Sequence, residues 1–353
     1  MKLPFVWDYY SDQPYILKKE DKKRLRKGYT LDFLKLFLTN IIYFPYLLIK
    51  FFIIKLKKSS PEVIDKRLFY GVCVNLDKGV AQYELVEELG VESLQMRFFL
   101  NDMANIDIYV EFVKGFGDKN ILITVIQSRE HIEDSKLLRQ DIKIVFEKFK
   151  DITNEFMIGN AVNRIKWGFV TIEEYLRFYE IVQSVRDEYF KDIKLVGSSI
   201  IDFEYHFTIR TLFNHFKIRF DAISSLLYVD RRGSPKNKQY WIFDLNNKII
   251  FLKTILKASY KTEKKIYITE TNWPLSGTAP YAPTSEKECV NEEDYSTFML
   301  EYFDITLKNA QIERVYWHQL ISAGYGLVDN RNGILRKREA FYAFKRMISE
   351  NIY

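Results

Sequence analysis

The strongest constraint on the fold is a regular alternation that begins after Lys66. Short runs rich in β-branched and aromatic residues are separated by stretches with apolar residues at helical spacing. The predicted strands are residues 68–76, 93–100, 121–127, 155–159, 194–199, 222–228, 265–269 and 314–318. Strand and helix alternate in this way over about 285 residues, which predicts an α/β fold, a (β/α)8 TIM barrel. A doubly wound sheet is the alternative, but no G-x-G-x-x-G turn follows the first predicted strand.

Barrels of this kind carry their functional residues at the C-terminal ends of the strands. The candidate residues are therefore the polar and aromatic side chains at the points where the apolar runs stop. They are Asn75, Asp77, Arg97, Gln127, Arg129, Asn160, Asn163, Asp202, Glu204, Tyr228, Asp230, Glu270, Asn272, Trp317 and His318. A polar mouth with several carboxylates and aromatic rings suits a sugar better than a phosphate group, because the sequence has no Gly-rich phosphate cradle there.

Three stretches resemble the glycoside hydrolases of clan A. Residues 266–274 (IYITETNWP) resemble the seventh strand of that family, and residues 315–319 (VYWHQ) resemble the eighth. Residues 326–344 are similar to the segment that closes the family's barrel. The resemblance covers about residues 68–350, is fairly specific from Lys265 onward and is loose before that position.

The resemblance implies roles for several residues. Glu270 would be the nucleophile, Arg97 would hydrogen-bond it and keep it ionised, and Trp317 would form the floor under the sugar. Because neighbouring strand residues point to opposite faces, Trp317 and His318 cannot both point inward, and we assign the inward position to Trp317. Tyr228 is placed to hydrogen-bond the same carboxylate as Arg97. The other predicted substrate-binding residues are Asn160, Asn163 and Trp273.

The sequence departs from the family at the fourth strand. The family carries Asn-Glu there, and its Glu is the general acid/base of a retaining reaction that needs two carboxylates about 5–5.5 Å apart. This chain has Asn160 followed by Ala161, which cannot donate a proton. The acid can come from Asp202, Glu204 or Asp230, in that order of preference. A second possibility is a substrate whose leaving group needs little general acid catalysis. A third is a domain without catalytic activity that binds glycan or serves as a partner subunit.

The first 67 residues form a different kind of segment. They hold 15 basic and 7 acidic residues, whereas the whole chain has a net charge of only +6. Residues 31–56 are apolar, interrupted by Pro45 and Lys50, and have basic clusters on both sides. We predict a membrane-associated helix that enters and returns or lies in the interface, with a kink at Pro45. The alternative is an amphipathic helix that packs under the barrel. No cleavable signal peptide is expected.

Composition excludes several other classes of protein. Residues 68–353 carry 38 basic and 40 acidic residues, which argues against a nucleic-acid-binding body. Two cysteines, Cys73 and Cys289, and four histidines argue against a disulfide scaffold and a metal cage, and we expect no cofactor.

The function predicted from the sequence is a membrane-associated glycosidase that acts on an envelope glycan or glycolipid at the inner (cytoplasmic) membrane, on a side that the sequence does not specify. A lipopolysaccharide core sugar such as keto-deoxy-octulosonate would suit Arg97, Arg129 and the Arg231-Arg232 loop. The alternatives are a catalytically degenerate glycan-binding or partner subunit and a barrel that transfers glycosyl groups.

Overall fold

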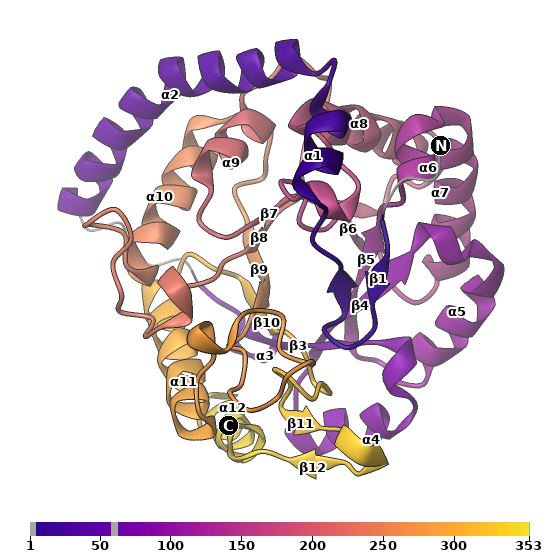
Figure 1. Ribbon diagram of the computed structural model, residues 1–353, viewed down its shortest axis with the longest axis vertical. Helices are drawn as coiled ribbons and strands as arrows, with labels where there is room; N and C mark the ends of the chain where they lie inside the picture. Colours follow the sequence, from indigo (N-terminus) through magenta and orange to yellow (C-terminus); the bar gives the residue numbers. More distant parts are fainter. Residues whose placement is uncertain (1–4, 58–62, 353) are drawn as a thin grey trace.

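The computed structural model describes residues 5–57 and 63–352. Eight parallel strands close into a barrel in the order β10-β3-β4-β5-β6-β7-β8-β9 (Figure 1). They are β3 (Tyr70–Val74), β4 (Ser93–Phe99), β5 (Asn120–Ile126), β6 (Glu155–Ile158), β7 (Lys194–Ile201), β8 (Ala222–Leu226), β9 (Ile266–Thr271) and β10 (Arg314–Trp317). Each predicted strand coincides with one of them, so the prediction of a (β/α)8 barrel is confirmed.

Helices surround the strand ring and cover its outer face. The principal ones are α4 (Ala81–Leu89), α5 (Ile106–Lys114), α7 (Ser135–Phe149), α8 (Ile172–Tyr189), α9 (Tyr205–Leu212), α10 (Leu245–Ala258), α11 (Glu292–Asn309) and α12 (Glu339–Ile352). Shorter elements include α3 (Lys66–Phe69) before β3 and α6 (Arg129–Glu133) after β5. Because side chains alternate along a strand, one set faces these helices and the other fills the barrel interior.

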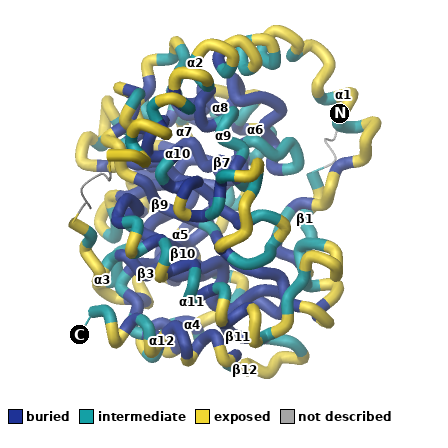
Figure 2. Tube along the Cα trace, turned by 90° about the vertical axis from the view of Figure 1, so that its left-hand side faces the viewer, coloured by how far each residue is buried: buried dark blue, intermediate teal, exposed yellow. Residues whose placement is uncertain are grey.

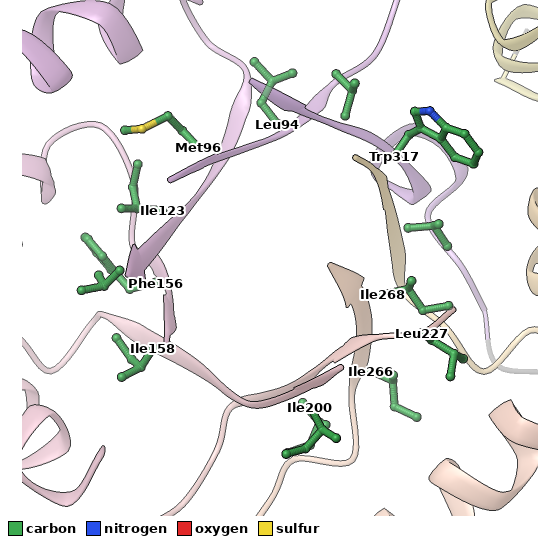
Figure 3. Close-up of a cluster of buried hydrophobic side chains, with 14 of the residues drawn as sticks. Leu94, Met96, Ile123, Phe156, Ile158, Ile200, Leu227, Ile266, Ile268 and Trp317 are labelled. Carbon is green, nitrogen blue, oxygen red and sulfur yellow. The ribbon is translucent and has the colours of Figure 1, made fainter. Parts of the chain in front are cut away.

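The hydrophobic core therefore has two layers. The larger layer lies between strands and helices and contains Leu94, Ile123, Phe156 and Ile268, whose side chains point away from the ring (Figure 3). The smaller set, which includes Leu122, Met157, Val196 and Tyr267, packs inside the barrel. These side chains fill the interior of the barrel below the C-terminal ends of its strands.

The described part of the N-terminal segment contacts the barrel at several places, beginning with a hairpin. A short hairpin, β1 (Trp7–Asp8) paired with β2 (Gln13–Pro14), lies over the strand ring, and α1 (Lys19–Arg26) follows it (Figure 1). The ring of Trp7 packs edge-on against Phe99, at the end of β4. The division of the chain at residue 67 stays a prediction.

The predicted apolar helix is present as α2 (Thr30–Lys57), a single helix that continues through Pro45. One face of α2 packs against α9 and α10 (Figure 1). In this contact Tyr43 stacks on Phe213, and Phe51 packs against Phe251. The opposite side is exposed along the helix (Figure 2). Its exposed apolar residues are Leu31, Leu34, Phe37, Leu38, Ile41, Ile42, Tyr46, Ile49, Phe52, Ile53 and Leu56.

The docking of α2 predicts a large difference between two neighbouring phenylalanines. The side chain of Phe51 is 0% exposed and that of Phe52 is 46% exposed. We expect Phe51→Ala to lower the free energy of unfolding by about 3–5 kcal/mol, because it removes a ring from a packed contact. Phe52→Ala should change it by less than about 0.5 kcal/mol. Denaturant unfolding of both variants checks this, and equal effects would mean that α2 is not docked in solution.

Candidate functional site

A cavity of about 180 Å³ lies at the C-terminal ends of the strands, under the N-terminal hairpin. Its lining comes from the ends of several barrel strands, from the loops that follow them and from the hairpin. The lining residues are Ser11, Asp12, Gln13, Arg97, Asn160, Ala161, Arg164, Lys166, Trp167, Ile201, Tyr228, Arg232, Glu270, Asn272, Pro283, Thr284, His318 and Tyr325. A larger hollow of about 630 Å³ lies at the other end of the barrel, beside Asn120 and Thr153 where strands begin. That end of such barrels serves stability rather than chemistry.

Glu270, near the end of β9, occupies the centre of this site. The Tyr228 hydroxyl donates a hydrogen bond of 2.5 Å to its Oε1, as expected from the sequence, and the Nε2 of His318 lies 4.0 Å from its Oε2. Burial raises the pKa of Glu270 above its ordinary value, although the hydrogen bond from Tyr228 and the charges of Arg97 and Arg232 oppose that shift. The site thus holds a buried carboxylate that accepts a hydrogen bond from a neutral donor and whose ionised form is favoured by the charges of two cations.

Arg97 acts on Glu270 through its charge. Its Nε donates to Oδ1 of Asn75 at 3.0 Å, and its Nη1 donates to the backbone oxygen of Asp12 at 3.2 Å. The direct hydrogen bond to Glu270 that the family resemblance implied is replaced in this structure by these two contacts. Arg97 therefore links the barrel to the N-terminal hairpin while its positive field favours the ionised form of Glu270.

Asn160 and Ala161 lie where the family resemblance places the general acid. Both line the cavity, and Ala161 has a φ of 44°, which non-glycine residues rarely adopt. The backbone N–H of Asn160 donates to Gln127, whereas its side-chain Nδ2 is buried and has no hydrogen-bond partner among the described residues. The position of the missing acid thus faces the cavity, and a free amide donor lies beside it.

The three predicted substitute acids do not line the cavity. Arg164 pairs with Asp202 at 2.6 Å and with Glu204 at 2.7 Å, and Nδ2 of Asn163 also donates to Glu204. Asp202 is close enough for its charge to raise the pKa of Glu270. Asp230 begins the short helix η4 (Asp230–Arg232). The structure thus gives Asp202 and Glu204 a cationic partner already.

Asn163 holds the end of a strand instead of facing the cavity. Its Nδ2 donates to the backbone oxygen of Ile201, and its Oδ1 accepts from the backbone N–H of the same residue, both at 3.0 Å. This pair of bonds fixes the last residue of β7. The predicted contact of Asn163 with substrate is therefore not supported by its position.

The prediction that Trp317 and Trp273 face the sugar is wrong. Both indoles are 0% exposed and stack on each other with centroids 5.9 Å apart, in the layer between strands and helices. The Nε1 of Trp317 donates a hydrogen bond to the hydroxyl of Tyr295, on α11. Figure 3 shows the Trp317 ring pointing away from the barrel interior. The next residue, His318, takes the inward position, because consecutive side chains point to opposite faces of a strand.

The N-terminal hairpin supplies site residues that the sequence did not indicate. Asp12 accepts from Lys78 at 2.9 Å and from Gln319 at 3.3 Å, and Gln13 accepts from Lys166 at 2.6 Å. Strands of two residues have no periodicity to detect, and Asp12 is 85 residues away from Arg97 in sequence. The sequence alone therefore gives no sign that these residues lie at the C-terminal end of the barrel.

Two further cations line the cavity, Lys166, which the sequence did not indicate, and Arg232, from the loop that we expected from the sequence to meet an acidic sugar. Burial lowers the pKa of Lys166 to about 8. The guanidinium of Arg232 lies 3.3 Å above the ring of Tyr228. Arg129, by contrast, pairs with Glu133 and Glu174 at 2.8 Å each and lies outside the cavity lining.

No group of three or more His, Cys, Asp or Glu side chains within residues 5–57 and 63–352 is arranged to hold a metal ion.

No family model matches the sequence, and a search of curated proteins found no significant match. Solved structures do resemble its fold. A family 1 β-glucosidase from Thermotoga maritima has a TM-score of 0.58 at 11% identity, over 83% of this chain and 99% of the enzyme. The virulence factor SghA from Agrobacterium tumefaciens scores 0.57 at 10% identity (81% and 97%). The GH53 catalytic domain from Ignisphaera aggregans scores 0.55 at 14% identity (80% and 99%). At these identities the likeness establishes that the chain has the barrel fold that these glycoside hydrolases share.

Proposed function

We propose that this protein processes a glycan in the cavity, with Glu270 as the nucleophile of a glycoside-hydrolase-like reaction. The observation that carries the proposal is the carboxylate of Glu270 at a strand end, held by Tyr228 at 2.5 Å inside a cavity at the barrel mouth. A nucleophile needs such fixed geometry because attack on the anomeric carbon depends on orientation. The barrel fold shared with glycoside hydrolases supports the same function.

The proposed first step transfers the sugar to Glu270. Its carboxylate attacks the anomeric carbon, the bond to the leaving oxygen breaks, and a glycosyl ester forms that water then hydrolyses. The leaving oxygen needs a proton, which Ala161 cannot give. The protein should therefore be slow on glycosides with basic leaving groups and faster on those whose leaving group departs as a stable anion.

Covalent trapping tests this proposal. A 2-deoxy-2-fluoro glycosyl fluoride loses fluoride without needing a proton, so the absence of an acid at Ala161 should not prevent labelling. With a panel of neutral and acidic sugars of this type, we expect one glycosyl group to appear on the peptide that contains Glu270. Peptide mass spectrometry measures this, with Glu270→Gln as the unlabelled control. Labelling of other residues only, or of none, would favour the second candidate, a glycan-binding subunit, which the loss of the acid at Ala161 also motivates.

We also propose that α2 lies in the plane of a membrane and anchors the protein there. The substrate would then be a lipid-linked envelope glycan. By length and hydropathy α2 would be able to span a bilayer. However, α2 docks on α9 and α10, and Asn40 donates a hydrogen bond of 3.0 Å to the backbone oxygen of His206. These contacts favour a helix that lies on the membrane surface over one that spans the bilayer. Basic residues of α1 and Lys50, Lys55 and Lys57 supply charges for anionic headgroups.

Vesicle binding checks the membrane proposal. The full chain should sediment with phosphatidylcholine vesicles that contain phosphatidylglycerol, and less with phosphatidylcholine alone. Ile41→Asn combined with Ile49→Asn should weaken binding at least about tenfold, because each exposed isoleucine loses about 1.5–3 kcal/mol of burial. Ile334→Asn, at an equally exposed position outside α2, is the control. Equal binding by both variants, or self-association through α2 without lipid, would contradict the proposal.

A further inference from the structure

Of the four Arg and Lys side chains that line the cavity, only Arg164 forms a salt bridge with a carboxylate among the described residues, namely with Asp202 and Glu204. Arg97 instead donates to Asn75 and to the backbone oxygen of Asp12, and Glu270 acts on it only through its charge. Arg232 stacks on Tyr228, and its Nη1 is buried without any hydrogen-bond partner in the described chain. The Nζ of Lys166 donates to the neutral side chain of Gln13. The lining thus has four Arg and Lys side chains against two carboxylates, Asp12 and Glu270, and such an excess of positive charge favours a bound anion.

The backbone conformation at Arg231 and Arg232 sets the position of the Arg232 side chain. Arg231 and Arg232 have φ values of 48° and 56°, in the left-handed region that side chains other than Asn and Gly seldom occupy. Non-glycine residues persist there where the surrounding structure imposes the conformation, and such positions cluster at ligand-binding sites. Here the result is a guanidinium over the ring of Tyr228, whose hydroxyl contacts Glu270. An anion bound by Arg232 would thus lie beside the proposed nucleophile.

The environment of Lys166 is consistent with a missing anion. Burial is the main cause that lowers its pKa to about 8, and the charges of Arg164 and Lys22 lower it further. The carboxylates of Glu270 and Asp8 oppose this without restoring the ordinary value. An anionic group in the cavity would favour the ammonium form. Two buried donors without a hydrogen-bond partner among the described residues, Nη1 of Arg232 and Nδ2 of Asn160, belong to side chains that line the same cavity.

We propose that the cavity binds a single sugar unit that carries an anionic group, and that Arg232 and Lys166 hold its charge. This inference rests on the proposed function, whose substrate class it names. The cavity of about 180 Å³ is smaller than the roughly 300–1,000 Å³ of pockets that enclose drug-sized ligands, which suits one ring rather than a chain. A guanidinium binds carboxylate and phosphate alike through paired hydrogen bonds. Keto-deoxy-octulosonate, which we expected from the sequence to meet Arg97, Arg129 and the Arg231-Arg232 loop, is one member of this class. Arg97 and Arg232 line the cavity together with Lys166, and Arg129 does not.

Calorimetric binding to the full-length protein tests the inference without any turnover. The probes are glucuronic acid, galacturonic acid, keto-deoxy-octulosonate, glucose 6-phosphate, inorganic phosphate and the neutral sugars glucose and galactose. We expect at least one acidic sugar to bind about tenfold or more tightly than its neutral counterpart, with weaker binding at high salt. The carboxylate and phosphate arms show which anion the site takes.

Variants locate the charge contact. Arg232→Met and Lys166→Met should each reduce the preference for the acidic sugar about tenfold, and Arg232→Lys should retain part of it. Arg231→Met is the matched control, since Arg231 is the adjacent arginine, shares the left-handed backbone and is exposed. Circular dichroism confirms that each variant is folded, and the variant at Lys166 provides a second test if Arg232→Met does not fold.

Several results would overturn the inference. They are equal affinity for neutral and acidic sugars, equal losses in Arg231→Met and Arg232→Met, inorganic phosphate binding as tightly as the sugar phosphate, and no acidic sugar with a Kd of about 1 mM or tighter. Failure of the proposed function looks different. In that case acidic sugars bind through Arg232, but fluoro-sugars leave Glu270 unlabelled.

Discussion

Glu270→Gln is expected to lower kcat/KM at least ~1,000-fold on an aryl glycoside of the sugar that labels Glu270, which corresponds to about 4 kcal/mol of transition-state stabilisation. Glutamine has nearly the same shape and can still accept the hydrogen bond from Tyr228. It cannot attack the anomeric carbon as a carboxylate does, so the effect isolates the nucleophile. Initial rates with a chromogenic leaving group measure it, because such a substrate does not depend on an acid.

The control for this experiment is Tyr228→Phe, which leaves the carboxylate in place. Ionised Glu270 is the active form, so activity should be lost as the pH falls through its pKa. Burial raises that pKa, and the acid limb should lie above the ordinary carboxyl range. The hydrogen bond from Tyr228 favours the ionised form, so Tyr228→Phe should move the limb to higher pH. Unchanged turnover in Glu270→Gln would show that Glu270 is not the nucleophile, whatever the pH profile.

Much of the barrel was predictable because its signal is local. Apolar runs of strand length alternate with helical spacing along the chain, and each pattern needs only neighbouring residues to be recognised. The same regularity located Glu270, since the end of β9 must reach the mouth in any barrel of this type. The hydrogen bond from Tyr228 followed from the same rule, because β8 and β9 are neighbours in the sheet.

The site predictions that the structure does not support depend on strand register and on contacts between segments that are distant in sequence. Trp317 and His318 are adjacent, and a shift of one residue exchanges the face that each presents. The ladder between β9 and β10 has an irregularity between Val315 and Trp317, which no sequence pattern shows. Likewise, whether Asp202 is free depends on Arg164, which lies on a different loop.

The N-terminal segment shows why charge and hydropathy alone were ambiguous. The sequence allowed either a membrane helix or a helix packed under the barrel. In the structure α2 has both properties, with Leu47 and Phe51 buried on one side and Ile41 and Ile49 exposed on the other. Hydropathy reports the sum of both faces, whereas only the packing distinguishes them. The hairpin that precedes α1 and α2 also lines the cavity, so the segment proposed to meet the membrane is continuous with the proposed sugar site.

Ala161→Glu is expected to raise the rate on glycosides with poor leaving groups by about 100- to 10,000-fold, the range typical of general acid catalysis. Ala161 already has a φ of 44°, so glutamate adds little backbone strain beyond what alanine carries there. The residue lines the cavity with Glu270, and a carboxyl at this point restores the second of the two groups that retaining hydrolysis uses. Substrates whose leaving group departs without a proton should show almost no gain.

The dependence on the leaving group separates this chemistry from a simple change of shape. A plot of log kcat/KM against leaving-group pKa should be steep for the natural chain and flatter for Ala161→Glu, since a proton donor removes the penalty of a basic leaving oxygen. Ala161→Gln supplies the same volume without a titratable proton and should keep the steep slope. If glutamine and glutamate act alike, position 161 does not face the leaving group. If the natural chain already has a flat slope, another group in the cavity donates the proton, and Lys166, with a pKa lowered to about 8, is the residue to replace next.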